Sequence, residues 1–209
     1  MPKKNLVEIV CVIDRSGSMA DIRSDAVGGF NTFLETQKKL PGEAKMTLVL
    51  FNHNYEVLYS REDLRVVNPF TRETYVSDGT TALLDAVGRT IDDVGKILAN
   101  TPEDERPEKV IFAILTDGLE NASKDYTRPI IYEMIGQQRA KYAWEFLFLA
   151  ANQDAFEEAE KLCIDRSRAH NFVADSDGIK CAMNRICECV SEYRVPGRGK
   201  KKNADGRIK

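Results

Sequence analysis

Small oxygen-bearing side chains follow the first apolar run of the sequence. Residues 11–20 read CVIDRSGSMA, so that Asp14, Ser16 and Ser18 stand at alternate positions directly after the run. Alternate residues of an extended or turning loop project to the same side. One carboxylate and two hydroxyls are hard oxygen ligands, which suit Mg²⁺ or Mn²⁺ and do not suit a soft metal. The alternative is that Ser16 or Ser18 caps the helix that follows.

Two further segments carry side chains of the same kind. Asp117 follows another apolar run, in ILTDGLENAS, and Thr81 precedes a helical pattern, in DGTTALLDAV. Each segment alone fits an ordinary structural role, because Asp117-Gly118 can form a turn. Together, two carboxylates and three hydroxyls indicate a shallow site of low charge, which would leave a divalent ion under-neutralised.

The elements that must position these residues are legible from the apolar pattern. Short apolar runs predict strands over 6–13, 45–51, 55–60, 109–116, 144–150 and 169–174. Helical spacing predicts helices over about 21–39 and 153–162, and around the apolar positions 84–98, 131–135 and 179–193. This alternation predicts an α/β fold with a doubly wound, mostly parallel, Rossmann-like sheet. The short connection NHN predicts a hairpin, which makes 55–60 an antiparallel edge strand. Residues 169–174 are expected at an edge as well.

Ligands of such sheets bind outside the carboxyl ends of the strands. Asp14 and Asp117 both fall there, in loops that we expect to be exposed. Five other polar residues are candidates for the rim of the site: Asn121, Ser123, Asn152, Gln153 and Asp154. Helix capping is the alternative for Asn121 and Ser123, and it is the favoured interpretation for Asn152.

Length and charge divide the chain into a domain and a tail. The 209 residues are 43% hydrophobic, enough for one α/β domain with a sizeable core, which we assign to residues 1–193. The remainder, 194–209, has seven basic residues and one acidic residue, so a net charge of +6 leaves −9 for the domain. We expect the tail to be disordered. Nucleic acid is an unlikely partner except weakly through the tail, since the acidic domain disfavours a broad footprint.

Cysteine usage and hydropathy indicate the compartment. The five cysteines are odd in number, and Cys11 lies inside the first strand, which favours reduced thiols and a cytoplasmic protein. A zinc site is disfavoured, because Cys187 and Cys189 would point about 200° apart on a helix. No apolar stretch reaches the roughly 18 residues that a membrane span needs, so no membrane partner is expected.

The three polar segments, in this order, resemble a von Willebrand factor A (VWA) domain. They match the metal-ion-dependent adhesion site of that family: D-x-S-x-S at Asp14, Ser16 and Ser18, T-x-L-x-x-A at Thr81, Leu83 and Ala86, and T-D-G with Asp117. The similarity covers about residues 5–193 and is nearest to compact single-domain members of bacteria and phages. The resemblance implies that both serines and the threonine contact Mg²⁺ or Mn²⁺ directly or nearly so, and that the aspartates often act through water. Thr80 is the alternative to Thr81, which the spacing to Ala86 favours.

The resemblance implies a protein-interaction module and not an enzyme. An acidic side chain of a partner protein would fill the open position of the metal. The alternative is a magnesium-dependent phosphatase-like hydrolase on a similar sheet, as in the haloacid-dehalogenase phosphatases, which place D-x-D at the end of the first strand. Here Ser16 replaces the second aspartate, the general acid and base of that chemistry. The nucleotide-binding motif G-x-x-x-x-G-K-[ST] is absent from the sequence.

Overall fold

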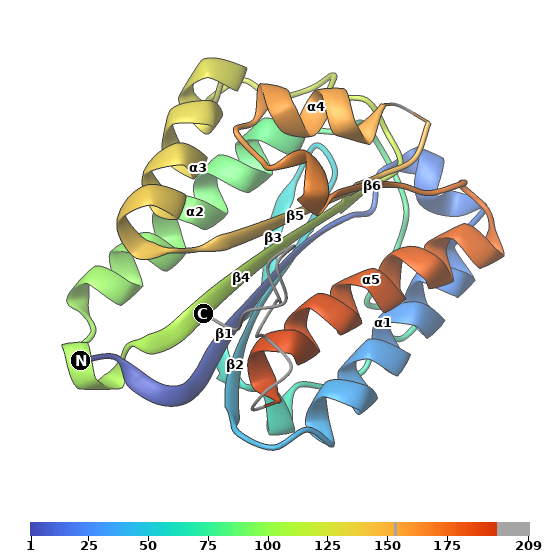
Figure 1. Ribbon diagram of the computed structural model, residues 1–209. Helices are drawn as coiled ribbons and strands as arrows, with labels where there is room; N and C mark the ends of the chain where they lie inside the picture. Colours follow the sequence, from blue (N-terminus) through green and yellow to red (C-terminus); the bar gives the residue numbers. More distant parts are fainter. Residues whose placement is uncertain (153, 196–209) are drawn as a thin grey trace, which may run out of the picture.

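A six-stranded sheet forms the middle layer of the molecule (Figure 1). The computed structural model describes residues 1–152 and 154–195, and its strands are β1 (Lys3–Asp14), β2 (Glu43–Phe51), β3 (Tyr55–Asp63), β4 (Pro107–Thr116), β5 (Glu145–Ala150) and β6 (Ala169–Asn171). Their order is β3-β2-β1-β4-β5-β6, with every pair parallel except β2 and β3. The predicted mostly parallel sheet, its antiparallel edge strand and the hairpin are therefore confirmed.

The central strands are mostly apolar because helices cover both faces of the sheet, and the buried Glu8 of β1, which pairs with Arg61, is an exception. In β1, Ile9, Cys11 and Ile13 belong to the core on one face, and Val10 and Val12 to the core on the other. Side chains alternate along a strand, so only a sheet that is buried on both sides requires every position to be apolar.

The helices form the two outer layers (Figure 1). α1 (Arg23–Lys38) and α5 (Ser176–Arg194) pack together on one face, and α2 (Leu83–Asn100), α3 (Arg128–Tyr142) and α4 (Ala155–Lys161) contribute to the core on the other. A 3₁₀ helix, η1 (Gly17–Ala20), precedes α1, which therefore begins two residues later than its apolar pattern predicted.

The strand order reverses between β1 and β4. From β1 the chain crosses to β2 on one side, and β4 then pairs with β1 on the other. The loops after β1 and β4 therefore leave the sheet in opposite directions, which opens a crevice at the carboxyl ends of these two strands. Asp14 and Asp117 lie at this crevice.

The end of the domain differs from the predicted boundary. Arg194, which we assigned to the tail, is the last residue of α5 and is buried. Its guanidinium donates hydrogen bonds to the carbonyls of Leu40 and Gly42, at 3.3 and 3.2 Å, and to Gln37. Gln153 and residues 196–209 lie outside the described residues. Among the described helices, none has the length and apolar character that crossing a membrane requires.

Candidate metal centre

Two buried carboxylates lie at the carboxyl ends of adjacent strands. Asp14 is the last residue of β1, and Asp117 directly follows β4. Ile13 pairs with Leu115 in the sheet, so the two chain ends emerge side by side. Asp14 is 0% exposed and Asp117 1%. The sequence prediction brought these residues to the correct edge of the sheet, but it expected them to be exposed, and they are not.

Both carboxylate oxygens of Asp14 accept hydrogen bonds from the protein. Oδ1 accepts from the backbone N–H of Ser16 at 2.7 Å, and Oδ2 accepts from the hydroxyl of Thr116 at 2.6 Å. The hydroxyl of Tyr75 also donates to the backbone carbonyl of Asp14. The first bond curls the chain after β1 into η1, and the second ties β1 to β4. Asp14 therefore holds the site together as well as lying in it.

The two serines turn their hydroxyls toward each other and not toward the helix backbone. Ser16 occupies the N-cap position of η1, but its side chain makes no capping hydrogen bond. Its Oγ lies 3.2 Å from Oγ of Ser18, and the Ser18 hydroxyl donates to Oδ1 of Asp117 at 2.5 Å. The capping role that was the alternative for these serines is thus not what their side chains do here.

Thr81 joins the serines, and Thr80 does not share its burial. Thr81 is 3% exposed, whereas Thr80 is exposed. An ideal β-carbon built on Gly118 would lie 2.9 Å from Oγ1 of Thr81, 3.4 Å from Oγ of Ser18 and 3.6 Å from Oγ of Ser16. Three hydroxyls from two separate segments thus converge on the space beside Gly118 that a side chain would otherwise fill. The sequence placed these three residues in one site, and the structure brings them together.

One oxygen of Asp117 has no protein partner. Oδ2 is buried, with no hydrogen bond, while Oδ1 accepts from Ser18. Buried polar atoms are nearly always paired, so a buried carboxylate oxygen without a protein partner, in a site that also gathers three hydroxyls, indicates a group able to hold a ligand. A divalent cation fits this donor set, because the oxygens are hard ligands and the carboxylate requires a positive charge.

Burial raises the pKa of both carboxyls. The pKa of Asp14 rises to about 6, mainly because burial disfavours the charged form, with a smaller contribution from repulsion by Asp117. The pKa of Asp117 is raised by burial as well, against a lowering by the hydrogen bond from Ser18. A cation between the two groups would favour their ionised forms and relieve this cost.

A network that the sequence did not reveal locks the loop after β4 to the start of α2. Glu120 accepts hydrogen bonds from the backbone N–H groups of Leu84, Ala122 and Ser123, at 2.8–2.9 Å. Asp85, in turn, accepts from the N–H groups of residues 124, 125 and 126, also at 2.8–2.9 Å. The only sequence signal was a cluster of acidic and small polar residues on both segments.

The predicted rim residues divide between support and capping. The side chain of Ser123 accepts from the N–H of Asp85 at 3.0 Å and so caps the first turn of α2 from the neighbouring loop. The side chain of Asn121 accepts from the N–H of Thr81 at 2.9 Å and so supports the segment before that helix. We had favoured Asn152 as the cap of α4, and this prediction is wrong. Asp154 caps it, accepting from Phe156 and Glu157. Asn152 instead donates to the backbone carbonyl of Asp117 at 3.0 Å.

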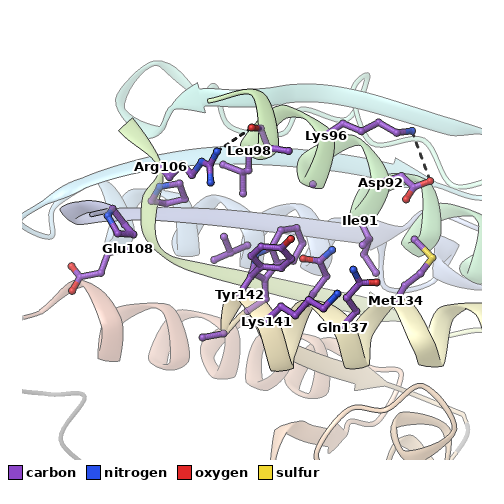
Figure 2. A pocket seen from close by; sticks show the side chains of 18 of the residues that line it. Ile91, Asp92, Lys96, Leu98, Arg106, Glu108, Met134, Gln137, Lys141 and Tyr142 are labelled. Carbon is purple, nitrogen blue, oxygen red and sulfur yellow. Dashed lines mark hydrogen bonds and ion pairs between the residues drawn. The ribbon is translucent and has the colours of Figure 1, made fainter. Parts of the chain in front are cut away.

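Other clusters and hollows lie apart from this centre. No group of three or more His, Cys, Asp and Glu side chains that could hold a metal occurs in the described part of the chain, and all five cysteines are free thiols. A hollow of about 760 Å³ lies between α2 and α3, lined by Ile91, Met134 and Trp144 among others. Figure 2 shows Ile91 and Met134 among the side chains that line it. Pro107, at the start of β4, also lines it. Val110 of the same strand lines it too and lies seven positions before Asp117, which is about 23 Å along the strand.

His53 lies beside the loop that bonds the segment of the two serines. It follows the carboxyl end of β2 and is exposed, and its ring covers Gly79, whose carbonyl accepts from the N–H of Gly17 at 3.0 Å. Its Nε2 lies 3.0 Å from the side-chain nitrogen of Asn54. Among the described residues it makes no hydrogen bond to Ser16 or Ser18.

Comparison with solved structures identifies the fold. No family model matches the chain, and no curated protein matches it in sequence. The proximal thread matrix protein 1 of the mussel byssus superposes with a TM-score of 0.60 at 14% identity, over 87% of this chain and 45% of the other. A second structure of that protein, with a zinc-occupied MIDAS motif, has a TM-score of 0.58 at 14% identity, over 88% and 45%.

Two microbial structures have the same fold as this chain. A von Willebrand factor type A protein from Catenulispora acidiphila has a TM-score of 0.55 at 15% identity, over 90% of this chain and 42% of the other. The ArnB paralog VWA2 from Sulfolobus acidocaldarius has a TM-score of 0.53 at 16% identity, over 87% and 44%. The chain thus spans less than half the length of these proteins. It has the fold of a VWA domain.

Proposed function

We propose that this VWA-fold chain is a metal-dependent protein-interaction module and not an enzyme. Ser16, Ser18 and Thr81 would hold a divalent ion, with Asp14 and Asp117 supplying the negative charge around it. The ion would offer its open position to a carboxylate of a partner protein. One observation carries the proposal: three hydroxyls converge beside Gly118, and the residue before it, Asp117, has a buried oxygen without a hydrogen bond.

The donor set favours Mg²⁺ or Mn²⁺. Its five side chains offer only carboxylate and hydroxyl oxygens, which are the ligands of hard cations, and no sulfur or imidazole. The zinc in the mussel protein's MIDAS motif supports a divalent ion in general, and it makes zinc the necessary competitor in any test. Hydroxyl ligands are neutral, so the ion keeps a positive charge that attracts a carboxylate from outside.

Calorimetric titration tests the metal site. We expect weak binding of one Mg²⁺ or Mn²⁺ per chain, lost in Ser16→Ala and in Thr81→Ala. Thr80→Ala is the matched control, because it removes the same hydroxyl from the exposed neighbour. Equal loss in both threonine variants, or tight zinc binding that Asp117→Ala leaves unchanged, would contradict the assignment.

The phosphatase-like alternative makes an opposite prediction. The nucleophilic aspartate of that mechanism must reach the substrate, but Asp14 is 0% exposed, and Ser16 stands where the acid and base would be. We therefore expect no hydrolysis of p-nitrophenyl phosphate with Mg²⁺. Turnover that depends on Mg²⁺ and disappears in Asp14→Asn would favour the enzyme and overturn the binding module.

Two further parts of the proposal concern the cellular compartment and nucleic acid. We place the protein in the cytoplasm, a proposal that five free thiols support. We also propose that nucleic acid is at most a weak partner through the basic tail. Retention on a DNA column at physiological salt by the chain without residues 196–209 would contradict this.

A further inference from the structure

A large apolar side chain is exposed directly beside the candidate metal centre. Leu119 is 59% exposed and follows Gly118, over which the three hydroxyls converge. Because consecutive Cα atoms are 3.8 Å apart, its Cα lies about 5 Å from the space that these hydroxyls surround. A group bound there would come within reach of the leucine side chain.

The loop that carries Leu119 is held on both sides. Before it, the Thr116 hydroxyl donates to the carbonyl of Gly118 at 3.1 Å. After it, Glu120 accepts three backbone hydrogen bonds, and the N–H of Asn121 donates to the carbonyl of Thr81 at 3.1 Å. The exposure of Leu119 is therefore a fixed feature of the folded loop and not the result of a loose segment. A pre-positioned apolar group costs little entropy to bind.

We propose that Leu119 determines which carboxylates this site accepts. The inference rests on the proposed function: the metal binds the acidic side chain, and Leu119 packs against an apolar side chain of the same segment. A peptide advances about 3.3–3.6 Å per residue, so the apolar residue stands one or two positions from the Asp or Glu. The preferred partner is thus a protein segment in which an acidic residue neighbours Leu, Ile, Val, Met or Phe.

Selection from a phage-displayed library of random linear peptides tests this preference. The full chain is immobilised with Mg²⁺, and a parallel selection contains a chelator. We expect the wild type to enrich, only with Mg²⁺, peptides that have Asp or Glu one or two positions from an apolar residue. Leu119→Ser should still enrich acidic peptides with Mg²⁺ but lose the apolar preference.

Val66→Ser is the matched control. Val66 is also 59% exposed, but it follows β3 at the opposite end of the sheet. This variant should select as the wild type does. A synthetic peptide chosen by the wild type should bind Leu119→Ser about tenfold more weakly, as loss of a partly buried leucine contact predicts. Leu119→Asp should weaken it further by repelling the acidic peptide, while calorimetric Mg²⁺ affinity and the melting temperature of Leu119→Ser stay unchanged.

The outcomes separate the two proposals. If wild type and Leu119→Ser enrich the same acidic peptides with no apolar neighbour, the role of Leu119 is wrong and the metal-dependent module stands. If the wild type enriches no acidic peptides with Mg²⁺, the proposed function is wrong and this inference falls with it. Equal weakening in Val66→Ser would also overturn the role of Leu119, because the effect would not belong to the metal centre.

Discussion

At the scale of single residues, the candidate centre combines groups that are unfavourable to bury. Asp14 and Asp117 lose hydration, and each has a raised pKa for this reason. Asp14 recovers part of the cost through bonds from Ser16 and Thr116, whereas Asp117 keeps one oxygen unpaired. Such an arrangement is costly in the metal-free protein and becomes favourable when a cation is bound, so metal binding should add to stability.

The pH dependence of stability should reveal the buried carboxyl of Asp14. Its pKa is about 6 when folded and 3.8 as an unperturbed group, so the folded state binds the proton more tightly. The contribution to stability is therefore present below pH 3.8, is lost as the pH rises toward 6, and stays lost above that. Without metal, the free energy of unfolding of Asp14→Asn should rise relative to that of the wild type by on the order of 2–3 kcal/mol as the pH increases through this window. Chemical denaturation between pH 4 and 7 in chelator measures the difference, and a constant difference across the range would contradict it.

The absence of a side chain at Gly118 should be essential for metal binding. In Gly118→Ala, the new β-carbon lies 2.9 Å from Oγ1 of Thr81 and occupies the space between the hydroxyls. The φ angle of Gly118 is outside the left-handed region, so the backbone accepts alanine at this position. We expect Mg²⁺ affinity to fall at least about tenfold with the fold retained, because a lost ligand contact of 1.4 kcal/mol has this effect. Gly28→Ala, where nothing lies within 4 Å, is the control. Unchanged affinity in Gly118→Ala would place the ion elsewhere.

At the scale of elements, α2 and the loop after β4 hold each other in place. Each segment supplies acceptors for the N–H groups of the other, through Asp85 on one side and Glu120 on the other. Tyr126, at the end of the same loop, covers Gly88 of α2. Thr81 and Gly118 flank this contact, so its packing sets the distance between two parts of the centre.

Two glycine substitutions in α2 should have opposite effects on stability. A β-carbon on Gly88 would lie 2.2–2.5 Å from the ring of Tyr126, so Gly88→Ala must displace the ring and should destabilise the protein by about 1–3 kcal/mol. Gly95→Ala meets only Gln138, at 3.8 Å, and should stabilise the helix by about 0.5–1 kcal/mol. Denaturant midpoints measure both. If the two variants melt alike, the contact between Tyr126 and α2 does not matter for stability.

At the scale of the whole molecule, α5 closes the layer that it shares with α1. Its last residue, Arg194, donates to carbonyls at the end of α1 and in the turn before β2. These groups lie at the amino end of the sheet, far from the candidate centre. The stability of this end and the chemistry of the other end should therefore be separable.

Two truncations test where the domain ends. A chain that stops after Val195 keeps Arg194 and should melt as the full chain does, with the same Mg²⁺ affinity. A chain that stops after Tyr193 loses the buried guanidinium and its hydrogen bonds to Gln37, Leu40 and Gly42, which should cost about 1–3 kcal/mol. Thermal melting followed by circular dichroism compares them. Equal melting temperatures for the two truncations would return the boundary to 193.

The sequence by itself determined the order of the elements and the class of sheet, and it predicted which residues make up the candidate centre. Strands such as 6–13 are apolar at every position except Glu8 because both faces are buried, and this pattern can be read without coordinates. Asp14, Ser16, Ser18, Thr81 and Asp117 could be chosen because their types, spacing and strand ends agree with one chemistry.

Only the tertiary structure decided how those residues are used. The burial of Asp14, the unpaired oxygen of Asp117, the role of Asn152 beside Asp117 and the lock between Asp85 and Glu120 all depend on contacts between distant segments. Local patterns report what a residue does to its own helix or strand, and Asn152 before a helix therefore looks like a cap. Its actual partner lies 35 residues away and is set by the pairing of β4 with β5, which no local pattern contains.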